Sequence, residues 1–236
     1  MRAILFDLDG TLLDLDLDEF LPRYFAALET AAAPLAAHAP ADAGIMSALH
    51  AATRRMMEDH SELTNRTVFF TEFAGRTGVD LAEHWPVFES FYRDVFPTLA
   101  DTARPAPGGR EAVEAARSLG LKVAIATNPI FPRVAVDHRI AWAGLGDMRF
   151  DLVTTYEDMT ACKPHPAYYR QIAAALGVHP RDCLMVGDDH VLDLAAADVG
   201  MRTYYVGVRE DSAADMSGDL ATLAELLPRL TGAASA

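Results

Sequence analysis

The sequence predicts an α/β fold: a doubly wound parallel β-sheet whose first strand is separated from the others by an all-helical insertion. A short apolar run at residues 3–6 ends directly in two aspartates. From about residue 110 onward, stretches of helical period alternate with short apolar runs. Between these parts, apolar residues 15–99 recur at helical spacing without an alternating strand pattern. Strands that alternate with helices through right-handed crossovers form a parallel sheet covered on both faces.

The first strand, residues 2–6, is expected to belong to this sheet. Leucine and aspartate alternate through residues 12–18, which predicts a small hairpin or a linker, with Asp18 capping the next helix. The insertion is expected to contain about four helices, the first ending at Pro34. Its apolar residues at helical spacing are Phe20, Leu21, Tyr24, Phe25 and Leu28, then Ile45, Leu49, Ala52 and Met56, then residues 68–73, and last Trp85, Phe88, Tyr92 and Val95.

A linker rich in proline and glycine, residues 103–109, returns the chain to the α/β pattern. The helices expected after it lie at about 110–119, 132–143, 166–176, 191–198 and 219–230, and the strands at 121–126, 151–154, 183–186 and 203–206. Residues 231–236 are expected to be frayed. We therefore expect a core formed by residues 1–14 and 104–236, with residues 15–103 as a helical cap including its linkers.

The composition excludes several classes of protein. Hydrophobic residues make up 51% of the chain and charged residues 23%, as in ordinary globular proteins. The net charge of −14 and the lack of a basic cluster argue against a nucleic-acid partner. No apolar stretch approaches the ~18 residues of a membrane span, and the run after Arg2 is too short for a signal peptide. We therefore expect a cytoplasmic protein without a membrane partner.

The two cysteines, Cys162 and Cys183, lack the spacing of a zinc site. A reducing compartment also argues against a disulfide between them. Cys183 is expected to fill a strand and Cys162 to lie in a loop.

Two aspartates one residue apart, Asp7 and Asp9, end the first strand. Alternate side chains of a strand share a face, so their repulsion would raise the pKa of one of them unless a cation lies nearby. Mg²⁺ suits such a site, because it binds one or two carboxylates together with waters and a substrate phosphate. Gly10 permits a tight turn, and the Thr11 hydroxyl can orient a neighbouring carboxylate. A strand followed by an Asx-type turn is the alternative.

The other strand ends carry groups that complement these carboxylates. Thr127 and Asn128 follow the second strand and suit an anion, while Lys163 lies on a proline-stiffened turn after the third. Asp188 ends the fourth strand, and Asp193 lies five residues further on. Because ligands of open α/β sheets bind at the carboxyl ends of the strands, we expect a metal, an anion cradle and a cation around one point.

These motifs resemble the four motifs of the haloacid dehalogenase superfamily and occur in its order. They are D-x-D-G-T at residues 7–11, T-N at Thr127 and Asn128, K-P at Lys163 and Pro164, and G-D-x-x-x-x-D from Gly187 through Asp188 to Asp193. The insertion after the first motif resembles the C1-type cap of subfamily I. The resemblance covers residues 1–14 and about 104–206 and implies a Rossmann-like core.

The resemblance also implies roles for individual residues. Asp7 would be the nucleophile that forms an aspartyl-phosphate, and Asp9 the general acid and then the base. The ligands of Mg²⁺ would be Asp7, the main-chain carbonyl of Asp9, and Asp188. Asp193 would hold a metal-bound water or Lys163 from the second shell of the metal.

The transferring phosphoryl group would be held by the remaining motif residues. Lys163 and Mg²⁺ would neutralise its charge, while Thr127 and the Asn128 backbone would bind its oxygens. Thr11 would orient the carboxylates. The implied reaction is Mg²⁺-dependent hydrolysis of a small-molecule phosphate ester by a monomer or homodimer. Asp9 argues against dehalogenation, because dehalogenases of the superfamily replace this acid.

Two other functions remain open from the sequence. A phosphomutase would pass the phosphoryl group of the intermediate to a sugar hydroxyl instead of water. A binding or regulatory protein would keep the site without using it. Asp189 stands where relatives often have serine or threonine, and either caps the following helix or tunes the metal site. His60, Asn65 and Arg66 lie between cap helices, where they either contact the leaving group or have no role in the site.

Overall fold

A six-stranded, all-parallel β-sheet forms the centre of the protein. The computed structural model describes residues 1–59, 62–207 and 213–232. The sheet has the order β5-β4-β1-β6-β7-β8. Its strands are β1 (Ala3–Phe6), β4 (Lys122–Ile125), β5 (Leu152–Val153), β6 (Cys183–Gly187), β7 (Arg202–Val206) and β8 (Met216–Gly218). The predicted doubly wound parallel sheet is confirmed.

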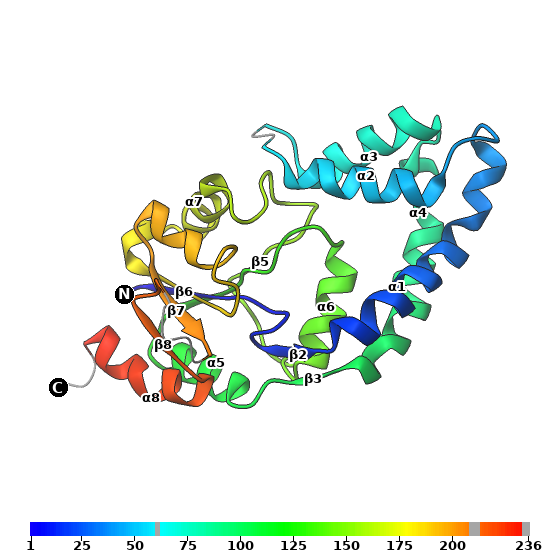
Figure 1. Ribbon diagram of the computed structural model, residues 1–236. Helices are drawn as coiled ribbons and strands as arrows, with labels where there is room; N and C mark the ends of the chain where they lie inside the picture. Colours follow the sequence, from blue (N-terminus) through cyan, green and yellow to red (C-terminus); the bar gives the residue numbers. More distant parts are fainter. Residues whose placement is uncertain (60–61, 208–212, 233–236) are drawn as a thin grey trace.

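Helices cover both faces of this sheet (Figure 1). Ile4 and Phe6 of β1 are buried on the face covered by α5 (Gly109–Ser118), α6 (Arg133–Trp142) and α8 (Leu220–Thr231). Ala3 and Leu5 are buried on the other face, against α7 (Pro166–Ala175) and the 3₁₀ helix η5 (Leu194–Val199). Successive residues of a strand point to opposite faces, so a strand buried on both sides is continuously apolar.

β1 lies at the point of the sheet where the order of successive strands reverses. The chain runs outward from β1 through β4 to β5, and then returns to the other side of β1 as β6 and continues to β7 and β8. In open α/β sheets, ligands bind beside the carboxyl ends of the strands at this reversal. Asp7 and Asp9 follow β1 directly and therefore lie at that position.

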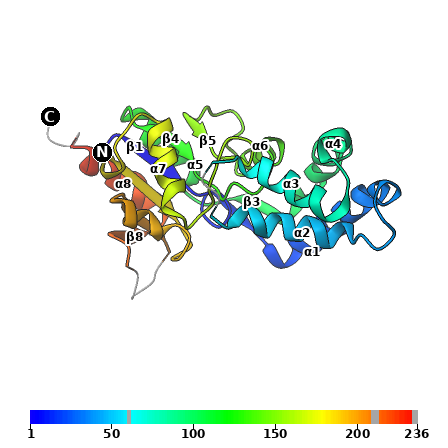
Figure 2. The ribbon, with the colours of Figure 1, turned by 90° about the horizontal axis from the view of Figure 1, so that it is seen from above.

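The residues between β1 and α5 form a helical block beside the sheet (Figures 1 and 2). The chain enters it through β2 (Leu13–Leu15) and leaves it through β3 (Ala103–Pro105), which pairs antiparallel with β2. The block contains the α-helices α1 (Leu17–Ala32), α2 (Ile45–Met57), α3 (Asn65–Thr77) and α4 (Leu81–Ser90), the 3₁₀ helices η1 (Ala33–His38) and η3 (Phe96–Thr102), and the π-helical turn η2 (Phe91–Val95). The expected four helices are present.

The helical block has a hydrophobic core of its own, which continues onto α6. Phe20, Phe73 and Phe96 are among its buried side chains, and Ala135 of α6 is buried in the same cluster. The ring of Phe96 stacks on Trp142 of α6 at a centroid distance of 5.1 Å. One helix therefore packs on both the sheet and the helical block.

Some details of the sequence prediction are wrong. Asp16, not Asp18, caps α1: its side chain accepts a hydrogen bond from the Glu19 backbone. The segment expected to be a helix at 191–198 is a turn followed by η5, and the Asp189 side chain accepts from the backbone of Val191 and Leu192 at the start of this turn.

The last part of the chain also differs from the prediction. Strand β8 was not expected, because its three residues, Met216–Gly218, show no apolar run. Helix α8 extends through Thr231, and Asp219 accepts from the backbone of Thr222 as its N-cap. Most of the C-terminal segment expected to be frayed lies outside the described residues.

Candidate active site

The candidate active site is a cavity of about 230 Å³ at the carboxyl ends of β1, β4 and β6. Its lining residues are Asp7, Asp9, Leu17, Thr127, Asn128, Lys163, Asp188, Asp189, Leu192 and Asp193. The structure thus brings together residues from all four sequence motifs, and among the predicted site residues only Thr11 does not line the cavity itself.

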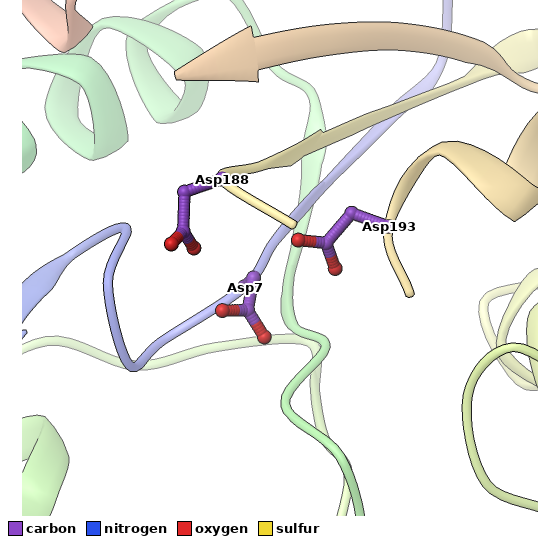
Figure 3. A group of neighbouring side chains, drawn as sticks. All are labelled: Asp7, Asp188 and Asp193. Atoms are coloured by element: carbon purple, nitrogen blue, oxygen red, sulfur yellow. The ribbon is translucent and has the colours of Figure 1, made fainter. Parts of the chain in front are cut away.

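Three aspartates from separate segments converge at this point (Figure 3). Asp7, Asp188 and Asp193 each offer a carboxylate oxygen, and these oxygens lie within 4.8 Å of one another. The group contains the side chain of Asp193 besides those of Asp7 and Asp188, while the main-chain carbonyl of Asp9 stays a predicted ligand. Figure 3 shows the carboxylates of Asp7 and Asp188 facing the same space from the ends of two neighbouring strands.

Lys163 connects two of these carboxylates. Its Nζ lies 2.6 Å from Asp7 Oδ1 and 2.6 Å from Asp193 Oδ1, and its side chain is only 2% exposed. Asp193 therefore contacts Lys163 directly, and holding this lysine stays a predicted role for it. Buried charges are tolerated when each is paired and hydrogen-bonded, and this lysine satisfies two acids at once.

Crowding and burial change the acidity of the cluster. Burial raises the pKa of Asp7 to about 8, although Lys163 opposes the shift, and Asp193 adds to it. Burial also raises the pKa of Asp188, against the hydrogen bond from Thr11. Burial alone would lower the pKa of Lys163, but Asp7 and Asp193 raise it well above its ordinary value. Ionising all of these acids beside a single lysine is therefore unfavourable without a further cation.

The donor set fits a hard divalent cation. All available ligand atoms are carboxylate oxygens, the kind of ligand that Mg²⁺ and Ca²⁺ prefer. The raised pKa values of Asp7 and Asp188 have burial as their largest cause. A bound cation would favour the ionised form of both groups and balance the excess charge.

Two glycines leave room for this cluster. The backbone at Gly10 has a φ of +85°, and a Cβ there would overlap the Asp188 carboxylate. A Cβ at Gly187 would overlap the carboxylate of Asp193. Any side chain at either position would push a predicted site residue out of place.

The hydroxyl and amide residues hold the surrounding loops. Thr11 Oγ1 donates to Asp188 Oδ1 at 2.9 Å. Asn128 Oδ1 accepts from the Lys163 backbone at 3.2 Å and so joins two of the motifs. The Thr127 carbonyl accepts from the hydroxyls of Thr154 and Tyr168 at 2.7 and 2.8 Å. Thr127 is therefore held rigidly at the end of β4.

The side chain of Asp9 faces a residue that the sequence analysis missed. Arg139 of α6 is 2% exposed, and its Nη1 donates to Asp9 Oδ2. The guanidinium lies over the Phe131 ring, 4.4 Å from the centroid. Nε and Nη2 of Arg139 and Oδ1 of Asp9 have no hydrogen-bond partner among the described residues. Donors without partners are unusual in a buried arginine.

A signal for Arg139 is present in the sequence. The buried residues of α6 are Ala135, Val136, Arg139 and Ile140, so the arginine stands at a position of the apolar period of the helix. A charged residue on the buried face of a helix marks an ion pair or a ligand site.

Asp189 acts as a cap in this structure. Its Oδ1 accepts from Val191 and Leu192 at 2.7 and 2.8 Å, and its own backbone N–H donates to Asp193 Oδ2 at 3.0 Å. This is the capping alternative, with a turn in place of the expected helix. The turn also fixes the carboxylate of Asp193 next to Lys163.

Two of the three cap residues considered from the sequence join the helical block to the core. Asn65 is fully buried, and its Nδ2 donates to Pro129 O at 3.0 Å and to Cys162 Sγ at 3.3 Å. The backbone of Arg66 donates to Tyr156 O at 2.7 Å, and its guanidinium lies 4.8 Å from the centroid of Phe70. His60 lies outside the described residues.

Residues 1–199 match the family of haloacid dehalogenase-like hydrolases, and the chain belongs to this family. The chain is 35% identical over 121 residues to phosphatase MT3486 of Mycobacterium tuberculosis, a match that covers 51% of this chain and 55% of that protein. The chain thus spans about half the length of the curated relatives it matches.

Solved structures match over nearly the whole chain. A phosphatase of the family from Thermococcus onnurineus is 25% identical and has a TM-score of 0.57, with 98% of both chains covered. A β-phosphoglucomutase from Clostridium difficile is 18% identical, with a TM-score of 0.59 and 99% and 98% of the two chains covered, and shows the fold alone. Among the described residues, no helix is long and apolar enough to cross a bilayer.

Proposed function

We propose that this protein is a cytoplasmic phosphatase that hydrolyses a small-molecule phosphate monoester through an aspartyl-phosphate on Asp7. The observation that carries the proposal is the pairing of Asp7 with Lys163 at 2.6 Å, with a second acid, Asp9, two residues further along the chain. Asp7 supplies a nucleophile beside the cation of Lys163, and Asp9 supplies a proton donor. The likeness to proteins named as phosphatases supports the same reaction.

The proposed chemistry divides between the two aspartates. A carboxylate oxygen of Asp7 attacks phosphorus, and the bond from phosphorus to the ester oxygen breaks. Asp9 gives its proton to the departing oxygen and later takes one from the water that attacks the aspartyl-phosphate, so inorganic phosphate leaves and Asp7 is regenerated. The main-chain carbonyl of Asp9 is proposed to face the metal.

The other residues stabilise the charge of the transferring group. Lys163 neutralises its oxygens, and the Thr127 hydroxyl and the Asn128 backbone bind them. Asp7 and Asp188, with Asp193 behind them, would hold Mg²⁺, which when bound adds positive charge beside the phosphoryl oxygens.

Residues 15–103 are proposed to act as a mobile C1-type cap, with residues 1–14 and 104–236 as the catalytic core. The paired strands β2 and β3 are the two covalent connections between these parts, and β2 begins four residues after Asp9. Closure of the cap would exclude bulk water from the aspartyl-phosphate and bring cap residues to the leaving group.

Hydrolysis of phosphate esters, measured as released phosphate with and without Mg²⁺, tests the proposal. Asp7→Asn is expected to lower kcat by at least ~10³-fold. Asp14→Asn, which changes an exposed aspartate paired with Arg104, serves as the control and is expected to keep the activity. Full activity of Asp7→Asn would overturn the mechanism.

Product analysis separates the alternatives. Isomerisation of a sugar phosphate without release of inorganic phosphate would establish a phosphomutase instead. Inactivity of the unaltered protein on a broad panel of esters, despite measurable Mg²⁺ binding, would establish a non-catalytic binding protein.

A further inference from the structure

Three exposed apolar side chains form a stripe along α1. Leu17, Leu21 and Phe25 are 53%, 39% and 37% exposed. Residues four apart lie on one face of a helix, so the three form a continuous apolar surface. Single exposed apolar residues are ordinary, but three in line indicate a surface that contacts something apolar.

The stripe connects the candidate active site to a second cavity. Leu17 lines the site that contains Asp7 and Asp9, while Leu21 and Phe25 line a cavity of about 190 Å³ between the helical block and the core. Leu17 and Leu21 are separated by about 6 Å of helix rise. Residues 128–130 also connect the two cavities, because Asn128 lines the active site and Ile130 lines the second cavity. The two cavities therefore lie next to each other along α1 and residues 128–130, although they share no lining residue.

The wall of the second cavity is mostly aromatic and aliphatic. It includes Tyr24, Phe69, Trp85, Phe88 and Phe131. The rings belong to both parts of the molecule, with Phe131 from the core and the others from the helical block. An occupant would therefore contact both parts at once.

Several polar groups of this wall already have partners within the wall. The hydroxyls of Tyr24 and Tyr92 lie 3.1 Å apart, and Thr53 Oγ1 donates to Leu49 O at 3.0 Å. The His50 ring packs on Phe25 at a centroid distance of 4.9 Å. The hydroxyl of Tyr156, which also lines the cavity, has no hydrogen-bond partner among the described residues and could bind one polar group. A sugar placed here would lose the water around its hydroxyls and gain few hydrogen bonds in return, which is unfavourable. An apolar group has no hydrogen bonds to water to lose, and the burial of its surface is favourable.

We propose that the alcohol portion of the substrate is apolar, of the size of a phenylalkyl group, and lies along Leu17 and Leu21 with its end in the aromatic cavity. This inference rests on the proposed phosphatase activity and specifies its substrate class. The size follows from the volume, since an apolar cavity of about 150 Å³ accepts benzene and this one is somewhat larger. Phosphate esters of polyhydroxylated alcohols are correspondingly poor substrates.

A matched pair of esters tests the inference. Ethyl phosphate and 3-phenylpropyl phosphate have leaving alcohols of similar acidity, so their chemical steps are alike and they differ in the apolar group. The value of kcat/KM is expected to be at least about tenfold higher for the phenylpropyl ester, because several buried CH groups contribute. Glycerol phosphate and glucose 6-phosphate are expected to fall below it. Equal or lower kcat/KM for the phenylpropyl ester would overturn the inference.

Substitutions of two equally exposed residues test where the apolar group of the substrate binds. Leu21 and Val95 are both 39% exposed, but Val95 lines neither cavity. Leu21→Gln is expected to lower the ratio of kcat/KM between the phenylpropyl and ethyl esters about tenfold, and Val95→Gln to leave this ratio unchanged. The same ratio in both variants would overturn the placement.

A binding measurement separates this inference from the proposed function. Calorimetry with the Asp7→Asn variant reports affinity for 3-phenylpropyl phosphate and ethyl phosphate without turnover. Tighter binding of the phenylpropyl ester supports the apolar subsite even if the unaltered protein hydrolyses neither ester, an outcome that would contradict the phosphatase alone. Efficient hydrolysis limited to polyhydroxylated esters would contradict the subsite alone.

Discussion

At the scale of single residues, Arg139 has the least expected environment in the molecule. It is buried with a single ionic partner, Asp9, and two of its nitrogens have no partner among the described residues. Burying a guanidinium with unmet donors is unfavourable, so the arrangement needs a compensating role. We infer that Arg139 is a positioning residue that holds Asp9 where a proton must be given and taken.

Replacing Arg139 tests this role through the leaving group. Arg139→Met is expected to lower kcat about tenfold to 100-fold for alkyl phosphates, which need a proton on the departing oxygen. For p-nitrophenyl phosphate, whose leaving group needs little protonation, the loss is expected to be only a few-fold. Arg133→Met, at the exposed end of the same helix where Arg133 pairs with Asp137, is the control. Equal losses on both substrates would assign Arg139 a structural role instead.

The acidity of Asp7 predicts how pH and metal act on stability. Its pKa is about 8 in the folded, metal-free protein and near 3.8 in an unfolded chain, so the folded state holds the extra proton between these values. The contribution of Asp7 to the free energy of unfolding is therefore present at low pH and is lost as the pH rises toward 8. A divalent cation favours the ionised carboxylate and offsets that loss.

The expected result is a larger metal effect at high pH. Millimolar Mg²⁺ should raise Tm more at pH 8 than at pH 6, because at pH 6 the ion must first displace the proton of Asp7. Differential scanning fluorimetry at the two pH values measures this. Asp7→Asn carries no titrating group at this position and should lose most of the pH dependence of the metal shift. A shift that is larger at pH 6 would contradict the prediction.

The sequence identifies the residues at strand ends but not those on helices. Asp7, Thr127 and Asp188 could be placed because each follows an apolar run, and parallel strands end at one edge of the sheet. Arg139 could not be placed in the same way. Its contact with Asp9 depends on how α6 packs beside β1, the strand that precedes Asp9. Only a tertiary arrangement brings these two segments together.

At the scale of elements, the N-terminus of α3 joins the helical block to the core. The Asn65 backbone donates to Met159 O at 2.8 Å, and its side chain donates to Pro129 O at 3.0 Å. A third link lies nearby, where His165 Nε2 lies 3.0 Å from Met57 O. These contacts lie away from β2 and β3, so the block is held at two separate places.

Removing the Asn65 side chain should therefore affect both stability and activity. Asn65→Ala leaves a buried carbonyl without its partner and is expected to cost about 1–3 kcal/mol of unfolding free energy. KM for the phosphate ester should rise as well, since the closed position of the block over the site loses one of its contacts. Thr64→Ala removes the N-cap bond of the same helix, at a cost of about 1 kcal/mol, without touching the core. The same rise in KM in both variants would refute an anchoring role for Asn65.

Two elements in the C-terminal part of the chain show why part of the fold could not be predicted from the sequence. The segment expected to be a helix at 191–198 is a turn followed by the 3₁₀ helix η5, and the apolar period of the sequence does not distinguish these from an α-helix. Strand β8 pairs with β7 although its residues have no strand pattern. Pairing in the sheet, which the local sequence does not encode, decides the second case.

At the scale of the whole molecule, α6 packs on both the helical block and the sheet, so we expect the stability of each part to depend on the other. Val136 and Ile140 pack on the sheet, while Ala135 and Trp142 pack in the cluster of the helical block. The division into a core and a helical insertion was readable from the change of period in the sequence. The shared helix was not, because a helical period does not show which of two neighbours each face contacts.

The two tryptophans test whether this sharing produces a single unfolding transition. Trp85 lies in α4 and Trp142 in α6, so Trp142→Phe and Trp85→Phe leave one fluorescent probe in each part. In each variant we expect the fluorescence and circular dichroism transitions in urea to coincide. Phe96→Ala should lower the free energy of unfolding from either probe by about 3–4 kcal/mol, since Phe96 is fully buried against Trp142. Val95→Ala, at its exposed neighbour, should cost less than about 1 kcal/mol. If the Trp85 fluorescence of the Trp142→Phe variant is lost at lower urea than its circular dichroism signal, the helical block unfolds by itself, and α6 does not couple the two parts.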